Sequence, residues 1–155
     1  MRRRLTYAGL LQLIAMLTVI TTVARGQEAA GNKILWTANW SPDGKYIAVG
    51  GADKKISIFS GQTYELLKMY NNVTDVQRMS WHPHLNLLAV AATGEGSKII
   101  NIERDSIISL KGISSSGTRA VAWNYKGDLL ANADYDGVIT IWNQSGELIR
   151  TINKE

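Results

Sequence analysis

Trp40-Ser-Pro-Asp-Gly-Lys-Tyr-Ile-Ala48 returns twice along the chain, as Trp81-His-Pro-His-Leu-Asn-Leu-Leu-Ala89 and as Trp123-Asn-Tyr-Lys-Gly-Asp-Leu-Leu-Ala131. The three tryptophans are 41 and 42 residues apart, and an alanine follows each of them eight residues later. Self-similarity at a fixed period of this length predicts consecutive copies of one supersecondary unit.

Within each copy the apolar residues alternate with polar ones, which is the periodicity of a β-strand. Pro42 and Gly44 stand where a tight turn between two strands is expected, because proline fixes φ and glycine accepts a positive φ. No segment after residue 30 shows a helical period. The strands predicted for the first and third copies are Leu35–Trp40, Tyr46–Gly50, Lys55–Phe59, Tyr64–Met69, Arg119–Trp123, Leu129–Ala133, Val138–Trp142 and Glu147–Ile152.

The middle copy departs from the other two in its third strand, predicted at Ile99–Ile102. We expect Ile100 and Ile102 to face inward, as Ile56 and Ile58 do in the first copy. This register needs three extra residues in the preceding loop, at 93–98. The alternative register places Lys98 inside, where an ammonium group is costly.

Two segments carry a family resemblance: Asp136-Gly-Val-Ile-Thr-Ile-Trp142-Asn143 and Asp53-Lys-Lys-Ile-Ser-Ile-Phe59-Ser60. They resemble the third strand of a blade in WD-repeat β-propellers, and residues 40–45 also resemble TolB-like propellers. The resemblance implies an all-β fold of three four-stranded antiparallel blades, at about 33–72, 73–114 and 115–155. It also implies that the turn aspartates Asp53 and Asp136 are structural, with Ser97 at their place in the middle copy.

Three blades form an incomplete ring, since propellers typically close with four to eight. Three solutions are open. The chain is part of a longer protein, two chains associate as a homodimer with six blades, or a partner supplies the other half of the propeller.

The basic residues are concentrated at the N-terminus. The whole chain has 17 Lys and Arg against 13 Asp and Glu, a net charge of +4. Four of these arginines lie in residues 1–26, which contain no acid, so the remainder is neutral and a nucleic-acid partner is not expected. The three arginines at 2–4, an apolar stretch and a small-residue exit before Gln27 predict a signal helix in 1–26, with a linker at 27–32. The expected location is secreted or periplasmic; an uncleaved segment would instead anchor the chain in a membrane.

Catalytic and metal-binding patterns are missing from the sequence. His82 and His84 flank Pro83 with no cysteine or acidic cluster beside them, so no metal is expected. No nucleophile elbow occurs, and Gly94-Glu-Gly96 lacks the strand-to-helix context of a dinucleotide site. We therefore predict a chain that is not an enzyme and has no cofactor.

Protein binding is the remaining class of function, and the resemblance to WD-repeat propellers implies which residues take part. WD-repeat propellers bind proteins or peptides through one rim, with contacts from the starts of the first strands and from the loops between second and third strands. The matching positions are Trp36, Gln77 and Arg119 and, in the last loop, Asp134 and Tyr135. An alternative for Trp36 is that it packs against a neighbouring blade. The predicted function is a non-catalytic, exported protein-binding scaffold; the alternative is a propeller fragment of a larger extracytoplasmic sensor or hydrolase.

Overall fold

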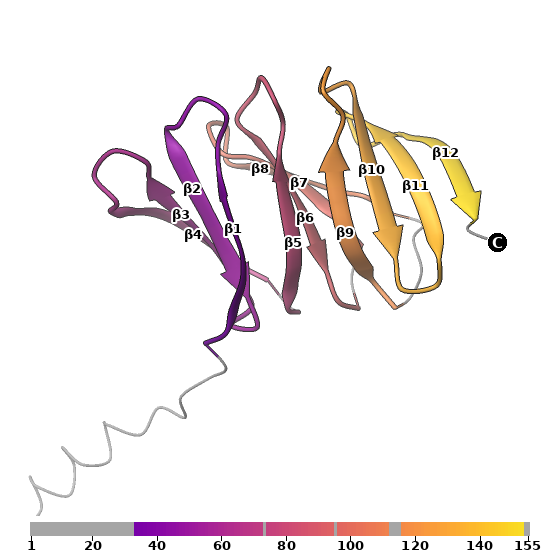
Figure 1. Ribbon diagram of the computed structural model, residues 1–155, viewed down its shortest axis with the longest axis horizontal. Coiled ribbons are helices and arrows are strands. Elements are labelled where there is room, and N and C mark those ends of the chain that lie inside the picture. The colour runs from indigo at the N-terminus through magenta and orange to yellow at the C-terminus, as the bar shows by residue number, and fades with distance from the viewer. Residues whose placement is uncertain (1–32, 73, 95, 112–115, 154–155) are drawn as a thin grey trace, which may run out of the picture. The chain divides into compact units, whose positions relative to one another are not determined.

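A computed structural model describes residues 33–72, 74–94, 96–111 and 116–153 of the chain. Within these ranges the regular structure consists of twelve strands, arranged as three four-stranded antiparallel sheets (Figure 1). Each sheet is built from one sequence repeat, which confirms the predicted all-β fold of propeller-like blades. The predicted signal helix at 1–26 and the linker at 27–32 lie outside the described residues.

The strands of each sheet follow one another in space as they do in the sequence, in the orders β1-β2-β3-β4, β5-β6-β7-β8 and β9-β10-β11-β12. Their bounds are β1 Leu35–Trp40, β2 Tyr46–Gly51, β3 Lys55–Ser60, β4 Leu66–Asn71, β5 Val76–Trp81, β6 Leu87–Ala92, β7 Lys98–Asn101, β8 Ser106–Ser109, β9 Thr118–Trp123, β10 Leu129–Asp134, β11 Val138–Asn143 and β12 Leu148–Asn153.

The turn between β1 and β2 shows why this motif makes a hairpin. Gly44 has φ of 71°, a conformation that a side chain disfavours. Asp43 Oδ1 accepts hydrogen bonds from Ser41 Oγ at 2.7 Å and from the Lys45 backbone nitrogen at 3.1 Å. The Ser41 hydroxyl in turn accepts a hydrogen bond from the backbone N–H of Tyr46. Polar side chains therefore supply the hydrogen-bond acceptors for backbone N–H groups of the turn.

Two apolar cores hold the three sheets together. In the first core, Ile56 and Ile58 of β3 pack with Val76, Leu88 and Ile100 of the second sheet. The second core joins the second and third sheets, and its buried members are Ala89, Ala91, Ile99, Leu110, Val121, Leu130 and Trp142. The second sheet therefore lies between the other two.

The side chains on both faces of strand β6 are buried, because the second sheet is covered on both sides. Leu88 and Val90 belong to the first core, while Ala89 and Ala91 belong to the second. All four side chains are fully buried, so the strand reads as one continuous apolar run without alternation. Strands covered on both faces have this composition.

The expected register of the middle repeat is wrong. Ala48 pairs with Ile58, Ala89 with Ile99 and Ala131 with Ile141, so Ile99 holds the place that was assigned to Ile102. Consequently the loop at 93–98 carries no insertion relative to the other repeats. Ile100 and Ile102 are buried as expected, but in the core that faces the first sheet.

Lys98 explains how this register is tolerated. Its side chain is half-buried, and its ammonium nitrogen donates a hydrogen bond to the side-chain oxygen of Asn72. The side-chain nitrogen of Asn72 donates in turn to the Thr74 carbonyl oxygen at 2.9 Å, which fixes the Asn72 side chain. The ammonium charge of Lys98 is therefore hydrogen-bonded, which removes most of the cost of its partial burial. In this register Ser97 matches Ile56 and Ile139, and the place of the turn aspartates falls on Gly94.

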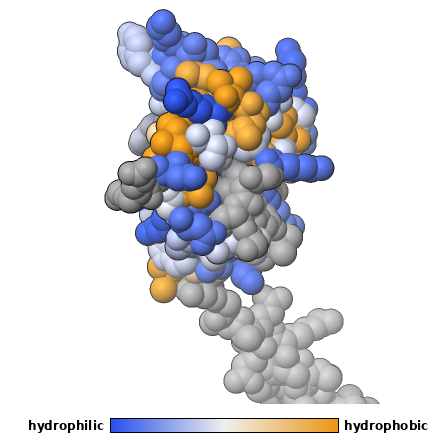
Figure 2. Space-filling model, turned by 90° about the vertical axis from the view of Figure 1, so that its right-hand side faces the viewer, coloured by the Kyte–Doolittle hydropathy of each residue, from blue (hydrophilic) through white to orange (hydrophobic). Residues whose placement is uncertain are grey.

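The outward faces of the first and third sheets keep apolar side chains at the surface. Trp40 in β1 is 54% exposed, and Leu148, Ile149 and Ile152 of β12 are exposed as well. Figure 2 views the chain from the side of the third sheet and shows apolar surface bordered by hydrophilic residues. In the described ranges, no helix is long and apolar enough to cross a membrane.

Candidate protein-binding site

The first strands of the three sheets lie side by side, and each has a β-bulge at the same place. Leu35 and Thr37 pair with consecutive residues of β2, which leaves Trp36 as the extra residue. By the same register shift Gln77 is the extra residue of β5, and Arg119 is the extra residue of β9. A bulge bends the strand and re-aims the side chain that it carries.

The three bulged residues meet in one hollow of about 500 Å³, which we call the rim pocket. Its lining consists of Leu35, Trp36, Gln77, Arg78 and Arg119. Trp36, Gln77 and Arg119 were predicted from their place in the repeat, and the structure brings them together. Leu35 and Arg78 were missed, although each directly adjoins a predicted position.

The rim pocket offers hydrogen-bond donors and an aromatic surface. Arg78 and Arg119 are exposed, and neither forms an ion pair with any residue that the structure describes. Trp36 is 42% exposed, and Gln77 is held by a 2.6 Å hydrogen bond from its Nε2 to Thr93 Oγ1. Unpaired guanidinium groups bind carboxylates through paired N–H donors, and an indole adds a large contact surface.

The other predicted binding residues, at the end of β10 and in the turn that follows it, do not line the rim pocket. Asp134 Oδ1 accepts the backbone N–H groups of Asp136 at 2.9 Å and Val138 at 2.8 Å, so this carboxylate shapes the turn. Tyr135 is 48% exposed beside it.

The two aspartates that the resemblance assigned to structural roles also lie in turns. Asp53 Oδ1 accepts the Lys55 backbone N–H at 3.3 Å, and Asp136 Oδ1 accepts the Ser116 hydroxyl at 3.2 Å. The turn before β11 therefore takes its two carboxylate–backbone bonds from Asp134.

His82 has a role that the sequence did not indicate. Its imidazole is buried, and Nδ1 accepts the backbone N–H groups of His84 and Leu85, both at 3.0 Å. Burial holds the pKa of His82 below its usual value, with a further contribution from His84, against a raising effect of Gly127. Among the residues described, no three histidine or acidic side chains are grouped so as to hold a metal ion.

Comparison with known proteins gives one family match and several relatives. The model of a family described as eukaryotic translation initiation factor eIF2A matches residues 15–155. A WD repeat-containing protein of Schizosaccharomyces pombe is 29% identical over 67% of this chain and 18% of its own length. A probable cytosolic iron-sulfur protein assembly protein 1 of Kluyveromyces lactis is 28% identical over 66% of the chain and 36% of its own length. The intraflagellar transport protein 122 homolog of Mus musculus is 30% identical over 78% of the chain and 10% of its own length.

These relatives overturn the predicted secreted or periplasmic location. The Kluyveromyces lactis relative is named as cytosolic and the Mus musculus relative as an intraflagellar transport protein. A further relative, from Schizosaccharomyces japonicus and 27% identical over 70% of this chain, is named as a probable cytosolic Fe-S cluster assembly factor. The charge and apolar pattern of residues 1–26 suggested export, but twelve of those residues, 15–26, fall inside the family match. The chain spans about a tenth to a third of the length of these relatives.

Proposed function

Because this chain belongs to the family described as eukaryotic translation initiation factor eIF2A and has WD-repeat relatives, we propose that it is a non-catalytic protein-binding scaffold acting inside the cell. Its rim pocket takes an acidic peptide segment of a partner protein. The observation that carries this proposal is that three equivalent bulges aim Trp36, Gln77 and Arg119 into the same hollow.

The acidic character of the ligand follows from the charges of the pocket. Arg78 and Arg119 lie at the surface without an anionic partner among the described residues, so binding a carboxylate does not require breaking an existing ion pair. Trp36 supplies apolar area beside them. Tryptophan and arginine are the residue types that dominate binding energy at protein interfaces.

The test uses fluorescence anisotropy of a labelled peptide of about ten residues that alternates glutamate with glycine, a length chosen to span an ordinary pocket. The peptide is acetylated and amidated, so that its ends carry no charge. Trp36→Ala and Arg119→Gln should each weaken binding about tenfold or more. Arg150→Gln is the matched control, because Arg150 is an exposed arginine of β12 outside the pocket.

Equal affinity of the wild type and both pocket variants would refute the proposal. So would equal binding of a peptide in which glutamine replaces every glutamate, because an uncharged amide cannot form the charge-assisted bonds.

The outward sheet faces support a second element of the proposal, a partner blade. Trp40 is the exposed counterpart of Trp81, whose side chain contacts the first sheet, and Ile139 and Ile141 are half-buried counterparts of Ile56 and Ile58, which contact the second. A blade of the same type, from a second copy or from another propeller, would cover these surfaces. Sedimentation equilibrium of the full chain tests the homodimer: a monomer at all concentrations would contradict it, and Trp40→Lys should dissociate a dimer.

A further inference from the structure

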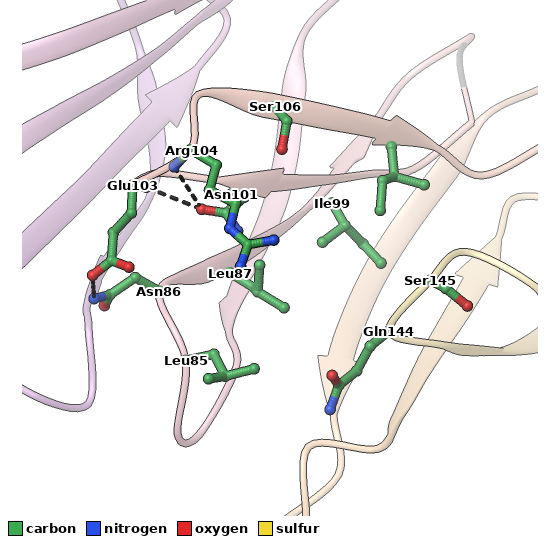
Figure 3. A pocket seen from close by; sticks show the side chains of 11 residues that line it. Leu85, Asn86, Leu87, Ile99, Asn101, Glu103, Arg104, Ser106, Gln144 and Ser145 are labelled. Atoms are coloured by element: carbon green, nitrogen blue, oxygen red, sulfur yellow. Dashed lines mark hydrogen bonds between the residues drawn. The ribbon is translucent and has the colours of Figure 1, made fainter.

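A second hollow lies at the opposite end of the first strands from the rim pocket. Three turns enclose it: β5–β6 and β7–β8 of the second sheet and β11–β12 of the third (Figure 3). Its volume is about 440 Å³, and we call it the turn groove. None of its lining residues belongs to the rim pocket.

Aliphatic side chains form the floor and one wall of the turn groove. Ile99 is 1% exposed at the bottom, and Leu87 is half-buried beside it. Ile108 and Leu85 are 37% and 48% exposed, so apolar area remains in contact with water. Covering this area with an aliphatic side chain is favourable, at about 25 cal/mol per Å² removed from water.

Two hydrogen-bond donors at the groove, on Asn101 and Arg104, are available to a ligand. Asn101 Oδ1 accepts the backbone N–H groups of Glu103 at 3.1 Å and Arg104 at 2.9 Å. This leaves the Asn101 amide nitrogen and the Arg104 guanidinium without hydrogen-bond partners among the described residues. Figure 3 shows the Arg104 side chain extending toward Leu87 next to Asn101. The nearby carboxylate of Glu103 accepts the Asn86 amide at 2.8 Å.

The groove is held in shape by its own hydrogen bonds. Gln144 on the far wall donates from Nε2 to the Gly127 carbonyl at 2.9 Å, and the same nitrogen lies 3.2 Å from His82 Nε2. Asn101 fixes the β7–β8 turn that carries Arg104. A ligand that enters such a site orders few additional side chains, which favours affinity.

The turn groove continues into a neighbouring hollow of about 370 Å³. Leu85, Asn86 and Glu103 line both, so the β5–β6 turn is a ridge between them. The neighbouring hollow reaches the β1–β2 turn at Pro42 and Lys45. The two hollows lie next to each other along turns of all three sheets, which suits an extended chain rather than a compact small molecule.

We propose that the turn groove is a second protein-binding site, which takes an extended internal segment of a partner protein with an acidic residue between aliphatic ones. The carboxylate binds to the Arg104 guanidinium and the Asn101 amide nitrogen, and an aliphatic neighbour covers Leu87 and Ile99. This site is independent of the rim pocket, so the chain has the means to hold two segments at opposite ends of its strands.

The probe is a labelled, acetylated and amidated peptide of about ten residues with Leu-Glu-Leu at its centre and serine and glycine elsewhere, read by anisotropy against the full chain. Arg104→Gln should weaken binding about tenfold. Leu85→Ser should weaken it about fivefold, because it removes exposed apolar area from the wall. Arg150→Gln, at an exposed arginine of β12 outside both hollows, should leave the affinity unchanged.

Three results would overturn the proposal. The first is loss of binding in Arg119→Gln but not in Arg104→Gln, which would assign this peptide to the rim pocket. The second is equal affinity for a peptide with Leu-Gln-Leu at its centre. The third is a wild type that does not bind the peptide but forms a dimer, and a dimer that Arg104→Gln dissociates. This result would assign the groove to a second copy of the chain.

Discussion

The indole nitrogen of Trp81 in β5 donates a hydrogen bond of 3.0 Å to the backbone carbonyl oxygen of Asn39 in β1. The bond crosses from the second sheet to the first, and Trp81 is 8% exposed. Trp123 also contacts the preceding sheet, but with its ring, which lies edge-to-face with His82 at 5.0 Å between ring centroids. Its indole nitrogen has no hydrogen-bond partner among the described residues. The repeated tryptophan is therefore the side chain with which a sheet contacts the sheet that precedes it.

Substitution of this tryptophan should have different costs in different repeats. Trp81→Phe should lower the free energy of unfolding by about 2 kcal/mol, because it removes the bond to Asn39 and leaves a gap in the first core. Trp40→Phe should cost less than about 0.5 kcal/mol, since an exposed side chain is exchanged there. Urea denaturation followed by circular dichroism measures both, and equal losses would contradict the assigned contact.

The buried polar cluster between the second and third sheets should be sensitive to Ser97. Its hydroxyl lies 2.9 Å from Thr118 Oγ1 and 2.8 Å from Asn132 Oδ1, and all three side chains are buried. Ser97→Ala should destabilise the chain by about 1–3 kcal/mol, because its partners lose a hydrogen bond without gaining water. Ser109→Ala, at an exposed position of β8, is the matched control. A neutral Ser97→Ala in thermal unfolding would mean that the cluster contributes nothing.

Alanine substitution at two glycines with the same backbone conformation distinguishes the cost of backbone strain from the cost of a side-chain collision. Gly127 and Gly137 have φ of 78° and 80°, but a Cβ at Gly127 would collide with the His82 ring, while one at Gly137 would meet nothing within 4 Å. Gly137→Ala should therefore cost about 1 kcal/mol from backbone strain alone. Gly127→Ala should cost roughly 3 kcal/mol or more, because the imidazole must also move. Similar unfolding midpoints for the two variants would refute this difference.

His82 should make stability fall in weak acid. Its pKa is lowered from the ordinary 6.5, chiefly by burial, so the folded chain binds this proton less readily than the unfolded chain does. The contribution is complete above pH 6.5 and is lost as the pH falls through the lowered pKa. Protonation also puts a hydrogen on Nδ1, which then cannot accept the N–H groups of His84 and Leu85. Unfolding free energies between pH 7.5 and 5 should drop in the wild type and in His84→Gln, and drop less in His82→Gln.

The repeat pattern predicted the sheets, because the alternation of apolar residues and the position of Pro42 and Gly44 are local signals. The register of the third strand in the middle repeat was not predictable in this way, because it depends on a partner for the half-buried Lys98. The amide of Asn72 comes from the preceding sheet, and a contact at that distance in the chain leaves no trace in a local pattern.

Three of the five residues that line the rim pocket were predictable, but the geometry of the pocket was not. The resemblance to WD-repeat propellers implied binding at the starts of the first strands, and the repeat spacing matched Trp36, Gln77 and Arg119 to those positions. The bulges that direct them depend on the partner strands, so no periodicity in the strand itself reveals them. The turn groove was not predicted, because Arg104 and Gln144 come from different repeats and meet only when the sheets stack.

Because the extra residue in each first strand is a bulge, the side chain that lines the rim pocket is independent of the strand pairing that forms the sheet. Trp36, Gln77 and Arg119 take no part in the ladder pairing of their strands, so each of them can be exchanged without altering the register on either side. The specificity proposed for the rim pocket should thus be adjustable one repeat at a time, at little cost to the cores. A library randomised at these three positions would retarget the chain while keeping its scaffold.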